Sequence, residues 1–205
     1  MDIVASERAM TDRMSGEKFR AFQQRRPDHE RWELIAGIPM MMPLPTLIHN
    51  HIASNLAQLL NSALSNHNAP RIAVQRSGIE LGTGDYRPEP DVVVLDADYE
   101  AEQSFVDRCY LLAEVVSSSD LVQFPQSKRP WIEVKRELYM KHAPCEAVLV
   151  IQQSWIEVHL DVRTESGWRS EKLEGADVPL VLPSFGVQCR VGHLYTGTPL
   201  LPRVV

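Results

Sequence analysis

The chain has 205 residues, of which 44% are hydrophobic and 23% charged, and this composition is typical of a globular protein with one good-sized core. Its formal net charge of −6 argues against a dedicated nucleic-acid binder with a basic surface, but it leaves room for an enzyme with a local basic groove. The three cysteines, Cys109, Cys145 and Cys189, form no Cys-x-x-Cys pair, so we expect neither a disulfide framework nor a zinc site. We find no signal-peptide core and no membrane-spanning stretch, and we expect a cytoplasmic protein.

The first predicted element is a short helix. We expect residues 1–14 to be disordered and residues 15–205 to form a single domain. Phe19 and Phe22 stand at helical spacing and predict a helix that runs from Ser15, its expected N-cap, to Arg26.

The clearest predicted element is a long helix over 46–66, with an apolar stripe on one side and Thr46 as its expected N-cap. Before it, residues 31–42 predict two strands around Ala36-Gly37. The later elements follow in order: strands at 71–81, 92–96 and 109–116, a loop at 117–129, a helix at 130–143, strands at 146–152 and 155–162, and closing segments at 167–173 and 180–191. This order predicts one α+β or mixed α/β domain.

Three chemically reactive side chains fall on consecutive predicted elements. Asp91 opens a short apolar strand, Glu114 lies inside the next strand, and Lys135 lies on the helix that follows, on the same face as Tyr139. Two carboxylates on adjacent apolar strands repel each other unless a cation lies between them, and Mg²⁺ or Mn²⁺ prefers such oxygen ligands. A nearby lysine could orient or deprotonate a water molecule or stabilise charge on a phosphate. The pattern therefore indicates metal-assisted phosphodiester hydrolysis.

Taken together, the segments "PEPDVVVLD", "LLAEVVSSS" and "KRELYMKHAPCEAVLVIQ" resemble the Uma2 family of restriction-endonuclease-like proteins, part of the PD-(D/E)xK nuclease superfamily. The family's Pro-Asp strand, Glu-Val-x-Ser strand and Lys-x-x-x-Tyr helix are matched at Asp91, at Glu114, and at Lys135 with Tyr139. Three further segments also match the family. The segment "WELIAGIPMMMPLP" is similar to the family's first hairpin, and "LPSFGVQCRVGHLY" is similar to its closing segment. The pair His49-Asn50 resembles the start of the family's long helix.

The resemblance implies a restriction endonuclease-like fold, in which helices flank a mixed central β-sheet and an N-terminal helix and β-hairpin precede it. It also implies that Asp91 and Glu114 hold the metal and that Lys135 replaces, from the helix, the lysine that the superfamily places on the strand. The literal Glu-x-Lys match at Glu133 is not assigned to the metal, because residues two apart in a helix do not share a face. The chain departs from the family pattern after the glutamate strand and after the helix, where the family's aromatic pair is lost.

Each of these residues also has a structural interpretation. Asp91 alone could be a turn or capping residue after a proline. A buried Glu114 could instead pair with Arg87 or Arg129. Lys135 could be a solvated helix residue, and Lys128 in the preceding loop is the competing catalytic lysine.

Three further residues are candidates for supporting roles. Glu33 lies in a predicted strand and is expected to be a further carboxylate at the site, although an exposed position fits as well. Tyr139 could be a packing residue whose hydroxyl finds a partner. His49 fits a capping or packing role as well as a place in the site.

The leading prediction is a Mg²⁺- or Mn²⁺-dependent endonuclease that hydrolyses nucleic acid, with DNA as the expected substrate. The methionine run at 40–42 and exposed strand surfaces favour a homodimer, and two sites would suit the cutting of two strands. The alternative is a binding or regulatory protein that keeps the nuclease fold with weak or no catalysis. A zinc hydrolase is not supported, since no histidine pair has ligand spacing.

Overall fold

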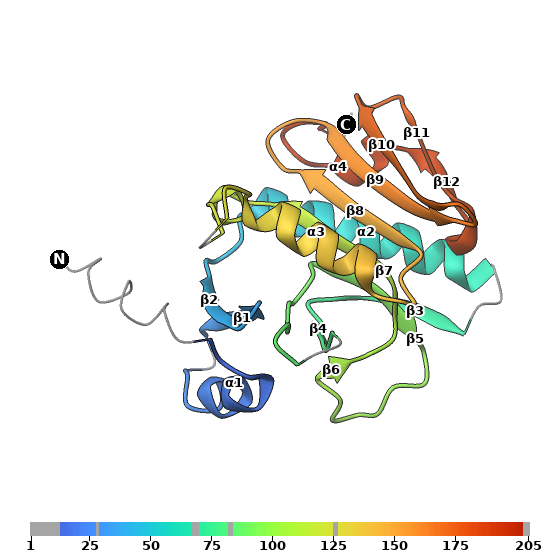
Figure 1. Ribbon diagram of the computed structural model, residues 1–205. Coiled ribbons are helices and arrows are strands. Elements are labelled where there is room, and N and C mark those ends of the chain that lie inside the picture. The colour runs from blue at the N-terminus through green and yellow to red at the C-terminus, as the bar shows by residue number, and fades with distance from the viewer. Residues whose placement is uncertain (1–12, 28, 67–69, 82–83, 125–126, 203–205) are drawn as a thin grey trace.

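A six-stranded mixed sheet forms the centre of the protein (Figure 1). The computed structural model describes residues 13–27, 29–66, 70–81, 84–124 and 127–202. The strands lie in the order β10-β9-β8-β7-β5-β3, and every neighbouring pair is antiparallel except β7 and β8. Their bounds are β3 Arg71–Gln75, β5 Val92–Asp96, β7 Cys109–Val116, β8 Ala147–Gln152, β9 Glu157–Thr164 and β10 Gly167–Glu174.

Helix α2, Leu47–Asn66, covers one face of this sheet. Its buried stripe recurs every four residues at Ile52, Leu56, Leu60 and Leu64, so a single side of the helix is apolar. The strands contribute every second residue to the same core, since alternate residues of β5 and β7 point to this face. The result is the largest hydrophobic core of the protein.

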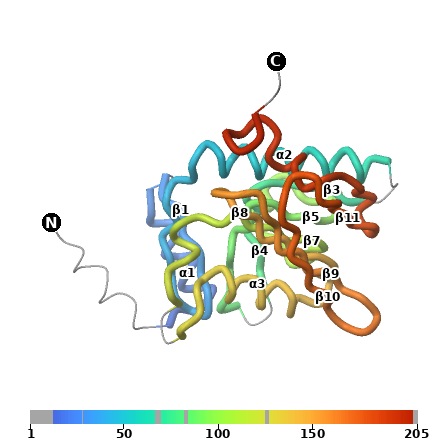
Figure 2. The backbone as a smooth tube through the Cα atoms, turned by 90° about the horizontal axis from the view of Figure 1, so that it is seen from above, coloured from blue at the N-terminus to red at the C-terminus, as the bar shows by residue number. Residues whose placement is uncertain are grey.

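Helix α3, Trp131–Lys141, covers the opposite face and connects the parallel strands β7 and β8 (Figures 1 and 2). A parallel pair needs such a crossover because a tight turn cannot join two strands that run in the same direction. An ion pair fixes the helix, since Nε and Nη2 of the Arg136 guanidinium donate to the fully buried carboxylate of Asp161 on β9. Charge-assisted bidentate pairs of this kind also fix orientation. The neighbouring helix residues Lys135 and Tyr139 therefore face the sheet in a defined position.

The hairpin of β1, Arg31–Ile35, and β2, Ile38–Met42, leads into the N-terminal end of α2, and helix α1, Gly16–Gln23, packs on the side of the hairpin away from α2 (Figures 1 and 2). The hairpin turn places Ala36 and Gly37 at positive φ, as a tight two-residue turn requires. Backbone hydrogen bonds in both directions between Leu34 and Arg87 attach the hairpin to the segment before β5. The hairpin is therefore held next to the strand that begins at Val92.

Smaller elements complete the fold. They are the parallel pair β4, Gly78–Ile79, and β6, Phe105–Val106, the hairpin β11, Pro179–Leu182, and β12, Val187–Arg190, the 3-10 helices Ser119–Leu121 and Pro183–Phe185, and helix α4, Gly192–Tyr195. No helix within the described residues is long and apolar enough to cross a membrane.

The mixed sheet flanked by helices confirms the predicted fold class, and the N-caps Ser15 and Thr46 are confirmed by the hydrogen bonds that their hydroxyls accept from Lys18 N and His49 N. Two predicted elements were wrong in extent. The first helix ends at Gln23 rather than at Arg26. The disorder expected for residues 1–14 falls mostly outside the described residues, which begin at 13.

The second error is the single strand predicted over 71–81. The chain breaks it into β3 and β4 at Arg76, whose φ of 56° lies in the left-handed region. A non-glycine residue adopts this conformation only where its surroundings fix it, and it ends the extended run of residues. The alternation changes phase at the break, from Ile72 and Val74 before it to Ile79 and Leu81 after it, and all four side chains pack in the same core cluster.

The core packing predicts a large effect of Leu56→Ala. Leu56 is buried on the stripe of α2, and its truncation leaves a cavity, so we expect the free energy of unfolding to fall by about 2–5 kcal/mol. Urea denaturation followed by circular dichroism measures it. Gln58→Ala on the exposed side of the same helix is the control and should change stability by no more than about 0.5 kcal/mol. Equal effects of the two substitutions would contradict the assigned packing face.

Candidate active site

A cavity of about 120 Å³ opens at the end of the sheet where β5 begins and β7 ends. The hairpin, the start of α2 and the loop after β7 close around it. Its polar lining residues are Arg31, Glu33, Thr46, His49, Glu89, Asp91, Glu114, Ser117, Ser118, Ser119, Asp120 and Gln153. Such a concentration of carboxylates in a small recess is unusual for a structural pocket, because a buried charge is costly unless it is paired.

Asp91 lies immediately before β5 and is held by two contacts. Its Oδ2 accepts a hydrogen bond of 2.8 Å from the backbone N–H of Val115, on the neighbouring strand β7. The same oxygen lies 3.1 Å from Nε2 of His49, in the first turn of α2. One carboxylate oxygen is therefore fixed by strand pairing and by the helix, and the side chain lines the cavity.

Glu114 lies on β7, on the face that α3 covers. Its neighbours Ala113 and Val115 belong to the core under α2, so the strand alternation turns Glu114 to the other side. Its Oε1 accepts a hydrogen bond of 2.5 Å from the hydroxyl of Tyr139 and lies 3.3 Å from the ammonium of Lys135. The backbone contact between Val115 and Asp91 places Glu114 beside Asp91 at the same end of the sheet.

Lys135 lies behind the cavity, with its side chain only 1% exposed. Its ammonium approaches Glu33 Oε2 at 2.8 Å, Glu114 Oε1 at 3.3 Å and Asp120 Oδ1 at 3.9 Å. The other oxygen of Glu33 accepts a hydrogen bond from the backbone N–H of Glu89. One buried cation thus joins the hairpin, the central strand β7 and the loop after it.

The cluster carries more negative than positive groups. Burial raises the pKa of Glu114 well above its usual range, and the neighbouring carboxylates of Asp91 and Glu33 add to the rise, although Lys135 opposes it. Burial likewise raises the pKa of Glu33. Burial by itself would lower the pKa of Lys135, but the surrounding carboxylates, first of all Glu114, raise it well above the usual lysine value. The site therefore favours a charged lysine and has room for additional positive charge next to its carboxylates.

The chain was compared with known proteins. The Uma2 family model, described as "Putative restriction endonuclease", matches residues 17–192. The chain belongs to the Uma2 family. A crystal structure of a protein from Anabaena variabilis, described as a putative nuclease belonging to DUF820, superposes with a TM-score of 0.67 at 17% sequence identity, covering 89% of this chain and 97% of that one. At this identity the likeness shows the fold. Curated protein sequences give no match.

The six candidate residues from the sequence analysis all lie at the end of the central sheet where β5 begins and β7 ends. Glu33, His49, Asp91 and Glu114 line the cavity. Lys135 and Tyr139 do not line it but contact Glu114 from behind.

Several alternatives do not hold in the structure. Arg87 pairs with Glu80, and Arg129 pairs with Glu133 and Glu137, so neither of them is the partner of Glu114. Lys128 is exposed on its loop, whereas Lys135 is buried among the carboxylates.

Glu133 and Lys135, the literal Glu-x-Lys match, lie on different sides of helix α3, as expected for residues two apart in a helix. Glu133 is half-exposed and pairs with Arg129, while Lys135 lies on the buried side of α3. The argument that residues two apart in a helix cannot share a face is confirmed here.

Two site residues escaped the sequence analysis. Asp120 is buried in the short 3-10 helix after β7, where its Oδ2 accepts hydrogen bonds from the backbone N–H and the hydroxyl of Ser117. Gln153 follows β8 and donates to the carbonyl of Val116. The serine run before Asp120 is a local signal for a side-chain turn, but Gln153 has no sequence signal, because only strand pairing brings β8 to the end of β7.

The cavity fits a divalent cation that takes part of its coordination from outside the protein. Within the described residues no three His, Cys, Asp or Glu side chains converge as a complete metal site. Asp91 and Glu114 are nevertheless hard oxygen donors at the wall of a polar recess. Mg²⁺ commonly binds to one or two carboxylates and keeps several waters and substrate phosphate oxygens as its other ligands. The donor set therefore suits Mg²⁺ or Mn²⁺ rather than Zn²⁺.

The buried cation predicts a strong effect of Lys135→Met in the absence of divalent ions. The substitution leaves the carboxylates of Glu33 and Glu114 with no positive partner, and we expect the free energy of unfolding to fall by about 3–5 kcal/mol. Chemical denaturation in EDTA measures it. Lys141→Met is the control, since this exposed lysine of the same helix pairs only with Glu137, and its loss should cost less than about 1 kcal/mol. Similar stability of Lys135→Met and wild type would show that the ion pairs do not hold the site together.

Proposed function

We propose that this protein is a metal-dependent endonuclease that hydrolyses phosphodiester bonds of DNA, with Asp91 and Glu114 as the metal ligands. The observation that carries the proposal is the position of these two carboxylates, side by side at the ends of β5 and β7, on a polar cavity and in front of a buried lysine. Membership of the Uma2 family supports the reaction class.

In this proposal the side chains of the site have separate roles in metal binding and in positioning. Asp91 and Glu114 bind Mg²⁺ or Mn²⁺, which, when bound, polarises phosphate oxygens and lowers the pKa of bound water. His49 fixes Asp91 by its contact of 3.1 Å, and Tyr139 fixes Glu114 by its hydrogen bond. Glu33 holds Lys135 in place from the hairpin.

Lys135 would assist the attacking water as a cation. Its ammonium is enclosed by carboxylates, and these contacts favour the charged form, which cannot accept a proton. From behind Glu114 its positive charge would stabilise the negative charge that develops on the phosphate during in-line displacement. A role as general base is therefore not part of the proposal.

We also propose that the active form is a homodimer. Three large apolar side chains are exposed between the end of β2 and the start of α2, where Met41, Leu44 and Leu47 are 57%, 87% and 88% exposed. Exposed apolar clusters of this kind are typical of protein interfaces. Leu44 also lines the cavity, so an interface here would bring two sites close together, as the cutting of two strands requires.

The metal site is tested by substituting its ligands with their amides. Asp91→Asn and Glu114→Gln preserve side-chain volume, remove a charge and should abolish Mg²⁺ or Mn²⁺ binding measured by calorimetry. The same variants should lower metal-dependent nicking of a supercoiled plasmid by about 100-fold or more, because they remove groups on which the reaction depends. Glu171→Gln, at an exposed carboxylate of β10, is the matched control and should behave as wild type.

The outcomes separate the two functional hypotheses. Metal binding and cleavage that both amides abolish would support the nuclease. Metal binding by the wild type without cleavage of DNA would favour a binding or regulatory protein on the same fold. A wild type that binds neither ion, even with DNA present, would overturn the metal site.

The proposed dimer is tested by placing charged side chains in its expected interface. Leu44→Lys combined with Leu47→Lys should convert a dimer into a monomer in light scattering, because two lysines cannot be buried in an apolar interface without cost. Val181→Lys, at an exposed apolar residue of β11, is the control and should leave the mass unchanged. A monomeric wild type would refute the dimer and leave the metal site untouched.

A further inference from the structure

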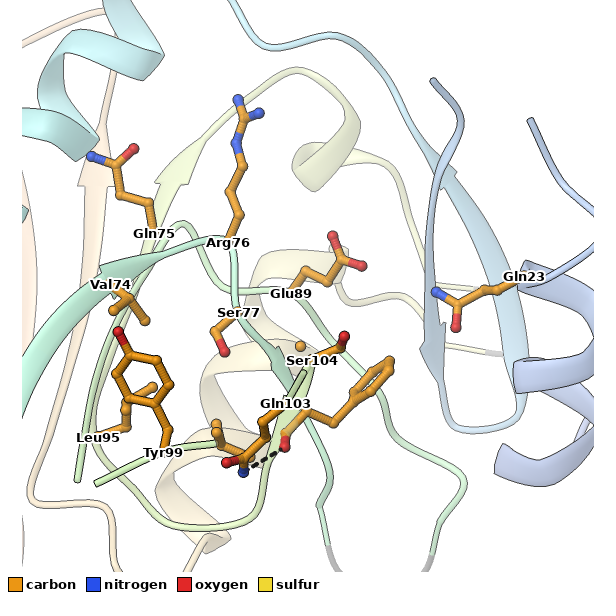
Figure 3. Close-up of a pocket in the computed structure, with 13 residues that line it drawn as sticks. Gln23, Val74, Gln75, Arg76, Ser77, Glu89, Leu95, Tyr99, Gln103 and Ser104 are labelled. Carbon is orange, nitrogen blue, oxygen red and sulfur yellow. Dashed lines mark hydrogen bonds between the residues drawn. The ribbon is translucent and has the colours of Figure 1, made fainter. Parts of the chain in front are cut away.

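A second, larger cavity adjoins the carboxylate site at the edge of the sheet. This groove has a volume of about 520 Å³, within the range of small-ligand sites. It runs between the β3–β4 segment and the loop that leads into β6 (Figure 3). Arg76, Ser77, Glu89, Tyr99 and Phe105 are among the residues that line it.

The groove is connected directly to the proposed metal site. Glu89 lines both cavities. The backbone N–H of Arg76 donates to the carbonyl of Asp91 at 3.4 Å, and its guanidinium donates to Asn50, the residue after His49. A chain that crosses the carboxylate cavity would therefore enter the groove next.

Arg76 gives one end of the groove a positive group. This residue interrupts the strand in a left-handed conformation, at φ 56°, and its exposed side chain points away from Tyr99 and toward the start of α2, where it donates to Asn50 (Figure 3). Glu89, a carboxylate that lines the groove, is already paired with Arg31 at 3.3 Å, so it opposes an anion less than a free acid would. A guanidinium in this place suits a phosphate, with which it can form two hydrogen bonds.

Tyr99 gives the other end of the groove an aromatic face. It is 52% exposed, and Figure 3 shows it at the end opposite Arg76. The loop that carries it is fixed by Gln103, which accepts a hydrogen bond from the backbone N–H of Glu100 and donates one to the carbonyl of Phe105. Phe105 in turn packs against Gly78 so closely that a Cβ there would lie 2.6 Å from its ring. Tyr99 therefore lies on a loop that hydrogen bonds and the packing of Phe105 hold in a defined position.

We propose that this groove binds one unpaired nucleotide of the substrate strand, next to the phosphate that is cleaved. Arg76 contacts the backbone phosphate at the end of the groove next to α2, Tyr99 stacks on the base, and the hydroxyl of Ser77 offers a hydrogen bond to the base edge. Only an unpaired nucleotide can use Tyr99, because the faces of bases inside a duplex are covered by their neighbours. This inference rests on the proposed nuclease function and adds to it a preference for single-stranded or locally opened nucleic acid.

The test compares a short fluorescent single-stranded oligodeoxynucleotide with its own duplex, by anisotropy in EDTA so that metal-dependent cleavage does not consume the probe. Wild type should bind the single strand more tightly. Tyr99→Ala should weaken single-strand binding about tenfold, through loss of base stacking, whereas Tyr99→Phe keeps the ring and the affinity. Arg76→Asn, which tolerates the left-handed backbone, should weaken binding and reduce the slope of log affinity against log salt by about one.

Arg190→Asn is the matched control, because this exposed arginine of β12 pairs with Asp177 away from the groove. Equal affinity for single strand and duplex, or single-strand affinity that survives Tyr99→Ala, would overturn the proposal. Plasmid nicking by the same samples separates the two failures. Cleavage without dependence on Tyr99 would refute the groove and keep the nuclease, whereas binding that depends on Tyr99 without any cleavage would keep the groove and refute the nuclease.

Discussion

The buried ammonium of Lys135 is the interaction on which the candidate site depends. It attracts Glu33 from the hairpin, Glu114 from the central strand and Asp120 from the loop after it, so that segments far apart in the chain converge on one charge. Removing a charge of this kind from water is costly, and only close carboxylates offset that cost. The position of α3, anchored through Arg136, is therefore a condition for assembling the site.

One lysine does not balance the carboxylates around it, and this imbalance is the chemically useful property of the site. A protein selected only for stability would pair each buried acid or replace it with an apolar residue. Here Asp91 and Glu114 meet at a polar recess with one oxygen each already fixed, and the unmet negative charge favours an incoming cation. Under the proposed function this charge is offset by a metal ion, and strongly shifted pKa values of the kind found for Glu114 are common in active sites.

Sequence reasoning succeeded where the signal was local. The long helix 47–66 and the strands at 92–96 and 109–116 were predicted within a residue of their bounds, because the helix has a hydrophobic period and a capping residue and each strand is a short, nearly continuous apolar run. It failed at Arg76, where the alternation shifts by one residue across a backbone break that was predicted as continuous strand. The groove beside that break was therefore invisible in the sequence, since it is built from a strand end and a loop that only the fold brings together.

By itself the sequence determined the mixed sheet with its flanking helices, the family, and a short set of candidate residues: Glu33, His49, Asp91, Glu114, Lys135 and Tyr139. Only the tertiary structure decided how they are connected. It placed Lys135, and neither Arg87 nor Arg129, as the partner of Glu114, and it added Asp120 to the cluster. The physical reason is that hydrophobic periods are encoded along the chain, whereas the partner of a buried charge is set by the register of strands and the packing of a helix, which no local pattern records.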